Sequence, residues 1–327
     1  MATRTLIEAI REGLRDEMRR DPSTIVLGED VGVKGGVFLA TDGLYDEFGE
    51  ERVIDTPLTE SMIVGVSIGA SANGLRPIAE IQFADFIFPA FNQLVSEAAR
   101  MRYRSNGAFG CPITVRAPYG GGVHGALYHS QSVEAFFTHV PGLKVVIPST
   151  PYDAKGLLRS AIRDYDPVLF FEHKKMYRSV RGDVPDGEYS VPLGKAAVTR
   201  IGAQVTVVAY GLMAHYALEA ADRVEDEDIS VEVIDVRTLR PLDRTTILDS
   251  VRKTGKCLVV YEANKFGGYG AEIAAMVAEE AFDYLDGPVM RVAAPDVPAV
   301  PYNHVLEDWF MLDPERIAGA IRDLAAY

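Results

Sequence analysis

The sequence contains few of the residues that stabilise small secreted proteins or cross membranes. Its two cysteines, Cys111 and Cys257, have no C-x-x-C spacing and lie in or beside apolar runs, which predicts buried, reduced thiols rather than a disulfide or a nucleophile. No apolar run approaches the roughly 18 residues of a membrane-spanning helix, and no signal-peptide core follows Met1. We therefore expect a cytoplasmic protein.

The motifs of several enzyme classes are also absent. The chain has no G-x-x-x-x-G-K-[ST] loop, no H-E-x-x-H and no Asp-rich calcium loop, which argues against a P-loop enzyme, a zinc hydrolase and a calcium-binding protein. Two glycine runs remain, Gly120–Gly122 and Gly267–Gly270. The second precedes a predicted helix, where phosphate can bind, but a tight strand-to-helix turn is the simpler explanation.

Charge and length restrict the function further. The chain has 47 acidic and 33 basic residues, a net charge of −14, whereas a nucleic-acid-binding protein shows a basic face. This acidity suits either a soluble enzyme or a protein that docks a basic partner. With 327 residues, 48% of them apolar, the chain is long enough for two domains with substantial cores.

Short apolar runs alternate with segments of helical periodicity along most of the chain. The first helix is predicted over 5–20, with Leu6, Ile10, Leu14 and Met18 at helical spacing. Other predicted elements include helices over 61–73, 87–102, 152–164 and 314–325 and a strand over Val205–Ala209. The alternation stops between Tyr177 and Gly194, a stretch rich in glycine and proline that we interpret as a connection between domains, and then resumes. The pattern predicts two α/β domains, each with a mostly parallel sheet flanked by helices.

Glu60 is the most informative single residue. It ends the run Asp55–Glu60, which follows the apolar pair Val53-Ile54 and precedes a helix predicted over 61–73. Open α/β sheets bind ligands where a strand ends and a helix begins. A helix N-terminus also favours negative charge, so Glu60 taken alone is better explained as a helix-capping acid.

Two other segments carry candidate site residues. His129 lies in Gly122–Ser132, a predicted loop with two histidines, a tyrosine and two serines, where an imidazole can either act on an anionic substrate or stabilise the loop. His124, in the same loop, is a second candidate. In the segment Glu80–Phe88, Gln82 ends the strand predicted over Ile78–Gln82, and the phenylalanines are either core residues or a surface for a flat heterocycle.

Taken together, these segments resemble the beta subunit of the decarboxylating component of 2-oxo acid dehydrogenase complexes. The resemblance covers nearly the whole chain. The matching stretches are Gly28–Gly32, Asp55–Glu60, Gly74–Pro77, Ile81–Phe91, Arg102–Ser105, Tyr128–Ser132, Pro141–Val146, Ser149–Leu158, Asp235–Asp243 and Lys253–Gly255.

The resemblance implies a thiamin-diphosphate pyrimidine-binding domain over 1–185, a linker over 186–200 and a transketolase C-terminal-type domain over 201–327, both domains being α/β. In this family an alpha subunit completes an alpha-two beta-two heterotetramer and holds Mg²⁺ and the diphosphate through a Gly-Asp-Gly motif. That motif is absent here, and Arg181–Val184 is the nearest string. The resemblance therefore implies that this chain forms half of an active site.

The resemblance also assigns roles to individual residues. Glu60 matches the glutamate that bonds a pyrimidine nitrogen of the cofactor and promotes formation of the reactive ylid. Leu58, Gln82 and Phe86 match neighbouring cofactor contacts, and His129 matches a catalytic histidine near the substrate carboxylate and the lipoyl group. Some members bind K⁺, mainly through backbone carbonyls, at positions that match Cys111, Ile113, Thr114, Ala161, Asp164 and Asp166.

The function implied is oxidative decarboxylation of a 2-oxo acid with reductive acylation of a lipoyl group on the acyltransferase. We expect a branched-chain 2-oxo acid from the strings Gly125–Ser132 and Gln82–Asp85. The alternatives are a pyruvate or acetoin dehydrogenase beta subunit, or a non-catalytic scaffold. In each case the C-terminal domain is expected to bind the subunit-binding domain of the acyltransferase. Glu60 and His129 favour catalysis, because a scaffold needs neither.

Overall fold

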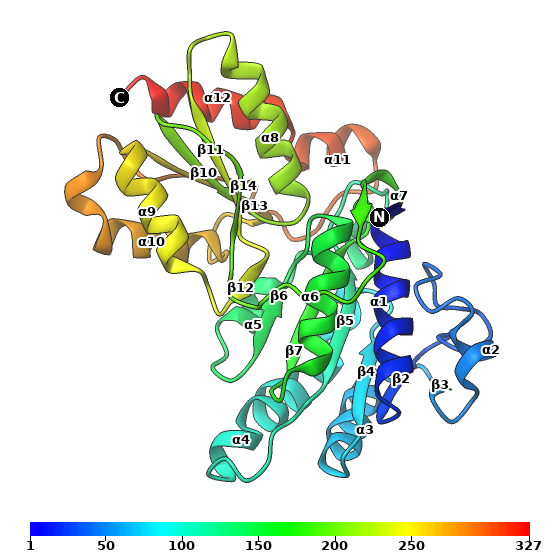
Figure 1. Cartoon of the computed structure of the whole chain (residues 1–327). Coiled ribbons are helices and arrows are strands. Elements are labelled where there is room, and N and C mark those ends of the chain that lie inside the picture. Colours follow the sequence, from blue (N-terminus) through cyan, green and yellow to red (C-terminus); the bar gives the residue numbers. More distant parts are fainter. The chain divides into compact units, whose positions relative to one another are not determined.

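The two runs of alternating strands and helices form two units in the computed structural model, which describes all of residues 1–327 (Figure 1). The first unit comprises Met1–Tyr119 and Phe136–Leu193, and the second comprises Gly120–Ala135 and Gly194–Tyr327. Both units are α/β, as the alternation predicted. None of the helices combines the length and the apolar composition needed to cross a membrane.

The first unit contains a parallel sheet whose strands lie in the order β6-β7-β5-β4-β2-β3. Its strands β2, β5 and β7 are buried along their whole length, which is typical of a parallel sheet covered on both faces. The strands of this sheet are β2 (Thr24–Gly28), β3 (Val53–Asp55), β4 (Arg76–Glu80), β5 (Thr114–Tyr119), β6 (Lys144–Val146) and β7 (Val168–His173).

Two long helices of this unit begin within one residue of the positions that the sequence predicted. In α1 (Leu6–Arg20), Thr5 and Glu8 form a capping box, and the predicted stripe from Leu6 to Met18 is buried. Helix α6 (Pro151–Arg163) begins after Thr150, whose hydroxyl accepts a hydrogen bond from the Asp153 amide. The two helices lie side by side (Figure 1). The other helices are α2 (Leu44–Phe48), α3 (Glu60–Ala72), α4 (Met101–Arg104) and α7 (Met176–Ser179).

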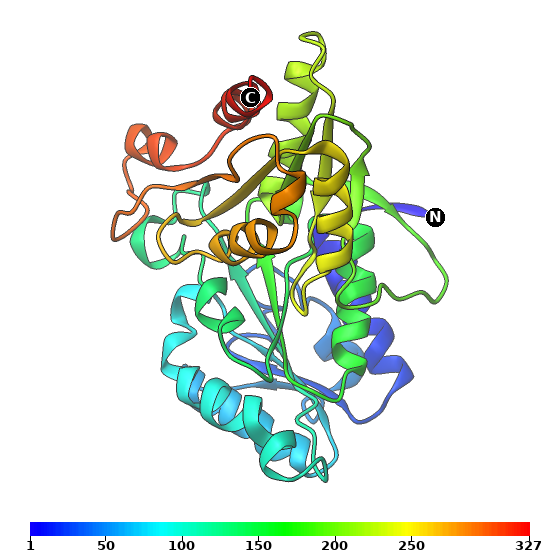
Figure 2. The same cartoon turned by 90° about the vertical axis from the view of Figure 1, so that its left-hand side faces the viewer.

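Two segments of this unit differ from the sequence-based expectation. The single helix predicted over 87–102 consists of short 3₁₀ turns, a π-helical turn at Gln93–Glu97 and α4, which run on from one another in Figures 1 and 2. Pro89 contributes by removing a backbone donor near its start. The predicted connection after Tyr177 contains strand β8 (Arg181–Val184), which pairs antiparallel with β1 (Ala2–Thr5), a partner too distant in sequence for a local pattern to indicate.

The second unit has a five-stranded sheet in the order β14-β13-β10-β11-β9. Only the edge strand β9 is antiparallel. Figure 2 shows helices on both faces of this sheet, and α8 packs beside α12. The elements are β9 (Ala197–Arg200), β10 (Val205–Ala209), α8 (Leu212–Glu225), β11 (Val231–Asp235), β12 (Thr238–Arg240), α9 (Arg244–Thr254), β13 (Cys257–Asn264), α10 (Gly270–Glu280), β14 (Met290–Ala294), α11 (His304–Phe310) and α12 (Pro314–Ala325).

A separate segment, Gly120–Ala135, also belongs to the second unit. It leaves the first unit after β5 and returns along the short helix α5 (Glu134–Thr138). It contains one 3₁₀ turn, Ala126–Tyr128, directly before His129. The sequence predicted a loop here but gave no indication that the loop belongs to the other unit.

Candidate functional site

The strand order of the first sheet defines where a ligand can enter. The chain passes from β2 to β3 on one side and then returns to β4 on the other side of β2. The connections after β2 and β4 therefore diverge, and such a switch point opens a crevice at the carboxyl ends of the strands. The segments that follow β2, β3 and β4 carry Glu29, Glu60 and Gln82.

Glu60 is the first residue of α3, so the helix-capping position predicted from the sequence is correct. Its carboxylate is only half-buried and accepts no hydrogen bond from another residue of the chain, while the preceding Thr59 provides no side-chain cap. Burial raises the pKa of Glu29, and the carboxylates of Asp30 and Glu60 add to the increase. Glu60 and Glu29 therefore share one electrostatic environment at this edge.

The other candidate residues of the first unit lie on the same set of loops. The Gln82 side-chain amide donates to the Glu29 carbonyl at 3.4 Å, which bridges the segments after β4 and β2. The Phe86 ring lies 5.8 Å from that of Phe83, centroid to centroid, and both are half-buried. Leu58, in the turn before α3, exposes 70% of its surface. The edge thus combines a carboxylate, an amide, aromatic rings and an accessible aliphatic group.

A buried charge cluster supports this edge from within the sheet. Arg116 on β5 donates to both carboxylate oxygens of Glu172 on β7, at 2.7 and 2.8 Å, and to Glu80 on β4 at 2.6 Å. The Tyr177 hydroxyl donates to Glu172 at 2.6 Å. Burial opposes the charge of Arg116, but Glu172 and Glu80 outweigh it and raise the pKa of the guanidinium. Burial raises the pKa of Glu80, against the opposing effect of Arg116.

His129 belongs to the second unit, unlike Leu58, Glu60, Gln82 and Phe86. It follows the 3₁₀ turn at Ala126–Tyr128 and is half-buried. A Cβ on Gly125 would lie 2.6 Å from the His129 carbonyl oxygen, so the loop closes on itself only with glycine at this position. His124 has its Nδ1 atom 2.5 Å from a carboxylate oxygen of Glu307, which gives this histidine a partner within the chain.

The second glycine run forms a turn with close packing. A Cβ on Gly268 would lie 2.4 Å from the Tyr261 ring, and a Cβ on Gly270 would lie 2.1 Å from it. Helix α10 begins at Gly270. Glycine therefore lets the start of α10 pack directly on an aromatic ring, and that packing accounts for the run.

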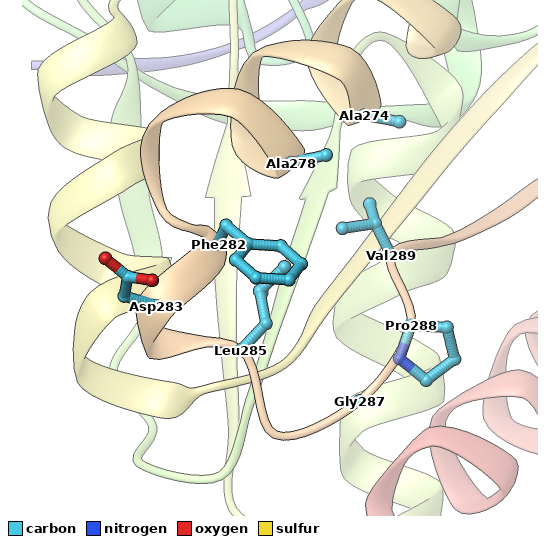
Figure 3. A pocket seen from close by; sticks show the side chains of 8 residues that line it. All are labelled: Ala274, Ala278, Phe282, Asp283, Leu285, Gly287, Pro288 and Val289. Carbon is cyan, nitrogen blue, oxygen red and sulfur yellow. The ribbon is translucent and has the colours of Figure 1, made fainter.

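A pocket in the second unit lies between α10, the 3₁₀ turn Phe282–Tyr284 and the segment before β14 (Figure 3). Figure 3 shows Phe282 and Leu285 on one side, with Pro288 and Val289 on the other. Asp283 is the only ionisable residue among those that line it. The pocket therefore provides apolar contact area but no set of groups for acid–base chemistry.

The remaining predicted positions are the two cysteines and the candidate potassium ligands. Cys111 and Cys257 are buried, unpaired thiols, as expected, and burial raises the pKa of Cys257 to about 12. Among the predicted ion positions, the carbonyls of Cys111, Ile113, Ala161 and Asp164 each accept a hydrogen bond from the chain. Lys144 lies 2.6 Å from an Asp164 carboxylate oxygen and already supplies a positive charge there.

Sequence reasoning missed three carboxylates near these candidates. Glu29 follows β2 and was noted only as part of a matching string, although an acid after a buried strand is the same signal that drew attention to Glu60. Glu262 and Glu307 both accept hydrogen bonds from the His129 loop. Neither lies near the loop in sequence, so no local pattern could have indicated them.

Known proteins resemble this chain over its full length. The family model "Transketolase, pyrimidine binding domain" matches residues 2–180, and "Transketolase, C-terminal domain" matches residues 194–317. The 2-oxoisovalerate dehydrogenase subunit beta of Bacillus subtilis is 58% identical over 327 residues, covering 100% of both chains. The pyruvate dehydrogenase E1 component subunit beta of the same organism is 52% identical, covering 94% of this chain and 95% of its own.

A eukaryotic relative and a solved structure also resemble this chain. The mitochondrial 2-oxoisovalerate dehydrogenase subunit beta of Dictyostelium discoideum is 51% identical over 98% of this chain and 86% of its own. A solved structure described as "Split gene transketolase, inactive beta4 tetramer" superposes with a TM-score of 0.80, covers 98% of both chains and is 24% identical. At that identity the structural likeness establishes the fold alone.

Proposed function

This chain belongs to the beta subunits of 2-oxo acid dehydrogenase complexes, and on that premise we propose that it forms half of a thiamin diphosphate active site. With an alpha subunit, it oxidatively decarboxylates a 2-oxo acid and transfers the acyl group to the lipoyl group of an acyltransferase. The pyrimidine-binding domain spans 1–185 and the C-terminal domain 201–327, joined by the linker 186–200. The observation that carries the proposal is the grouping of Glu29, Glu60 and Gln82 at one switch point.

The residues at this edge fit an aminopyrimidine ring. Glu60 presents a carboxylate with no hydrogen-bond donor from the chain, and it would hold the ring through one of its nitrogens. Gln82 and Leu58 would contact the ring, and Phe86 would pack on it. When bound, thiamin diphosphate supplies a nucleophilic carbon and an electron sink for decarboxylation. His129 donates to the substrate carboxylate and steadies negative charge there.

The alpha subunit supplies the metal and diphosphate site. Two observations support this division. Residues Arg181–Val184, the nearest string to the Gly-Asp-Gly motif, form the edge strand β8, and Asp183 accepts a hydrogen bond from Thr3 at 2.8 Å. No group of three or more histidine, cysteine or acidic side chains in the chain is arranged to hold a metal ion. Mg²⁺ therefore enters with the alpha subunit of an alpha-two beta-two heterotetramer.

Branched-chain 2-oxo acids are the proposed substrates. The full-length identity of 58% to a 2-oxoisovalerate dehydrogenase subunit beta supports this choice. The identity of 52% to a pyruvate dehydrogenase subunit beta supports pyruvate as the second candidate. A panel of 2-oxoisovalerate, pyruvate and acetoin, assayed with the co-expressed alpha and beta chains, distinguishes them through kcat/KM. If kcat/KM is highest with pyruvate, pyruvate becomes the first candidate substrate and the branched-chain 2-oxo acid the second.

The second unit docks the acyltransferase through that protein's basic subunit-binding domain. The net charge of −14 supports attraction between the two. A purely scaffolding role requires only this contact and leaves Glu60 and Gln82 without a function.

A potassium ion at the positions from Cys111 to Asp166 stays a prediction. Each carbonyl keeps a second lone pair, but Lys144 competes for the charge of Asp164.

The role of Glu60 is tested by Glu60→Gln in the assembled complex. An amide cannot share a proton with the ring nitrogen, so we expect proton exchange at the thiazolium carbon to fall sharply and kcat to fall about 10²- to 10⁴-fold. Proton exchange is measured by NMR after acid quench. Glu50→Gln is the matched control, because Glu50 is exposed and lies outside the edge. Unchanged proton exchange in Glu60→Gln would contradict the proposed role.

A further inference from the structure

We propose that two buried carboxylates of the second unit, Glu262 and Glu307, are positioning residues that fix the loop carrying His129. Glu262 lies on β13 and exposes 6% of its surface, and Glu307 lies on α11 and exposes 2%. Neither is a catalytic residue in the proposed reaction. The inference rests on the proposed function of His129, and it adds how the chain holds that residue in place.

Glu262 ties the two ends of the loop together. One of its carboxylate oxygens accepts a hydrogen bond from the Gly121 amide at 2.7 Å and another from the Ser132 hydroxyl at 3.2 Å. Gly121 lies before His129 and Ser132 after it. The amide of Gly120 also donates to the Gln131 carbonyl at 3.1 Å, beside this junction. The base of the loop is therefore closed around a single buried carboxylate.

Glu307 holds the first half of the loop. One of its oxygens accepts hydrogen bonds from the Gly122 and His124 amides, at 3.0 and 3.2 Å, and the other lies 2.5 Å from His124 Nδ1. A carboxylate that accepts several N–H groups makes stronger hydrogen bonds than a neutral acceptor. Helix α11 thus supplies one acceptor for two amides of the same short segment, and its second carboxylate oxygen lies beside a histidine side chain of that segment.

The loop needs such anchors because its backbone is strained. His124 and Ala126 have φ values of 56° and 54°, in the left-handed region that side chains with a Cβ rarely adopt. Such conformations persist only where the surroundings hold them, and they cluster at functional sites. Both strained residues lie within five positions of His129. Loss of a carboxylate should therefore let the loop relax and displace the imidazole.

The first test measures the loop directly in the assembled alpha–beta complex. We expect Glu307→Ala to accelerate hydrogen exchange about tenfold or more in the peptide covering 120–132, while peptides from β10 keep wild-type rates. Glu307→Gln should recover much of the protection, because its amide oxygen still accepts the two N–H bonds. Asp308→Asn, an exposed neighbour on α11, is the matched control. Wild-type exchange in Glu307→Ala would overturn the inference.

The second test separates positioning from general stabilisation. Glu307→Ala should lower kcat for lipoyl acylation about tenfold or more, since small displacements of an active group are costly. The double variant Glu307→Ala/His129→Ala should be no slower than His129→Ala, because Glu307 acts through His129. Additive losses would overturn the inference. Full turnover in His129→Ala would instead contradict the proposed function, and the exchange result would still stand.

Discussion

Arg116 shows how a single residue shapes the interior of the first unit. Its guanidinium is 1% exposed and forms hydrogen bonds with the carboxylates of Glu80 and Glu172, so three strands of the sheet meet at one charge cluster. Moving charges out of water is costly, and the cluster is stable only while every member keeps its partners. This cluster lies on the same strands, β4 and β5, that lead toward the candidate site.

Arg116→Met should destabilise the chain strongly. It leaves two carboxylates buried without their cation, and loss of one partner from a buried ion pair costs about 3–5 kcal/mol. Urea denaturation measures the effect. Arg104→Met is the matched control, because its pairing with Glu97 is exposed and such pairs contribute about 1 kcal/mol or less. Equal losses in the two variants would show that the buried cluster has no special role.

Glu134 should make stability depend on pH. Burial raises its pKa from 4.5 to about 7, with a further contribution from Glu262, while the Tyr210 hydroxyl donates to it at 2.8 Å. The folded chain therefore binds this proton more tightly than the unfolded chain. The resulting stabilisation is complete below pH 4.5 and is lost as the pH rises to about 7, a change of about 3 kcal/mol in the free energy of unfolding.

Glu134→Gln isolates this contribution. The amide is neutral at every pH and still accepts from Tyr210, so the variant should lack this part of the pH dependence. Urea titrations of both proteins at pH 5 and pH 8 give the comparison. The variant should gain stability relative to wild type at the higher pH. If the free energy of unfolding of the variant differs from that of the wild type by the same amount at pH 5 and at pH 8, the raised pKa of Glu134 is contradicted.

At the scale of elements, two devices explain why helices begin where they do. Hydroxyl and carboxylate caps begin α1, α6 and α12, at Thr5, Thr150 and Asp313. Helix α10 begins differently, through glycines that admit the Tyr261 ring. The sequence showed those glycines but not the ring, because the ring comes from β13.

Gly270→Ala should destabilise α10 although alanine favours helices. Its Cβ would lie 2.1 Å from a Tyr261 ring carbon, so the ring or the helix must move, at a cost of about 1–3 kcal/mol. Gly319→Ala in α12 is the control, since a Cβ there has no neighbour within 4 Å and should stabilise by about 0.5–1 kcal/mol. Thermal melts should show a lower melting temperature for Gly270→Ala than for wild type, and a higher one for Gly319→Ala.

At the scale of the whole molecule, the candidate residues are divided between two units. Leu58, Glu60, Gln82 and Phe86 lie in the first unit, and His129 lies in the second, on a segment that departs from the first unit after β5. The chain also lacks the Gly-Asp-Gly motif. Under the proposed function, a second polypeptide therefore completes the site.

The chain alone should show no decarboxylation of a 2-oxo acid and little affinity for thiamin diphosphate. Under the proposed function the diphosphate and Mg²⁺ contacts belong to the alpha subunit, so adding that subunit should restore both. Release of carbon dioxide and calorimetric titration of the cofactor measure the two properties. The complex with Glu60→Gln serves as the inactive reference. Turnover by the isolated chain would contradict the half-site model.

The sequence by itself determined the elements, the α/β class and the family. Strand and helix periodicity are local, so β10 and α12 lie where predicted, and the ordered motifs indicated the family that the comparisons confirm. The roles of Glu60 and His129 stay predictions. Only the tertiary structure decided that Gln82 meets Glu29, that Arg116 joins Glu80 to Glu172, and that Glu262 and Glu307 hold the His129 loop. Each of these contacts joins residues far apart in the chain, where their pairing depends on strand order and burial rather than on any local pattern.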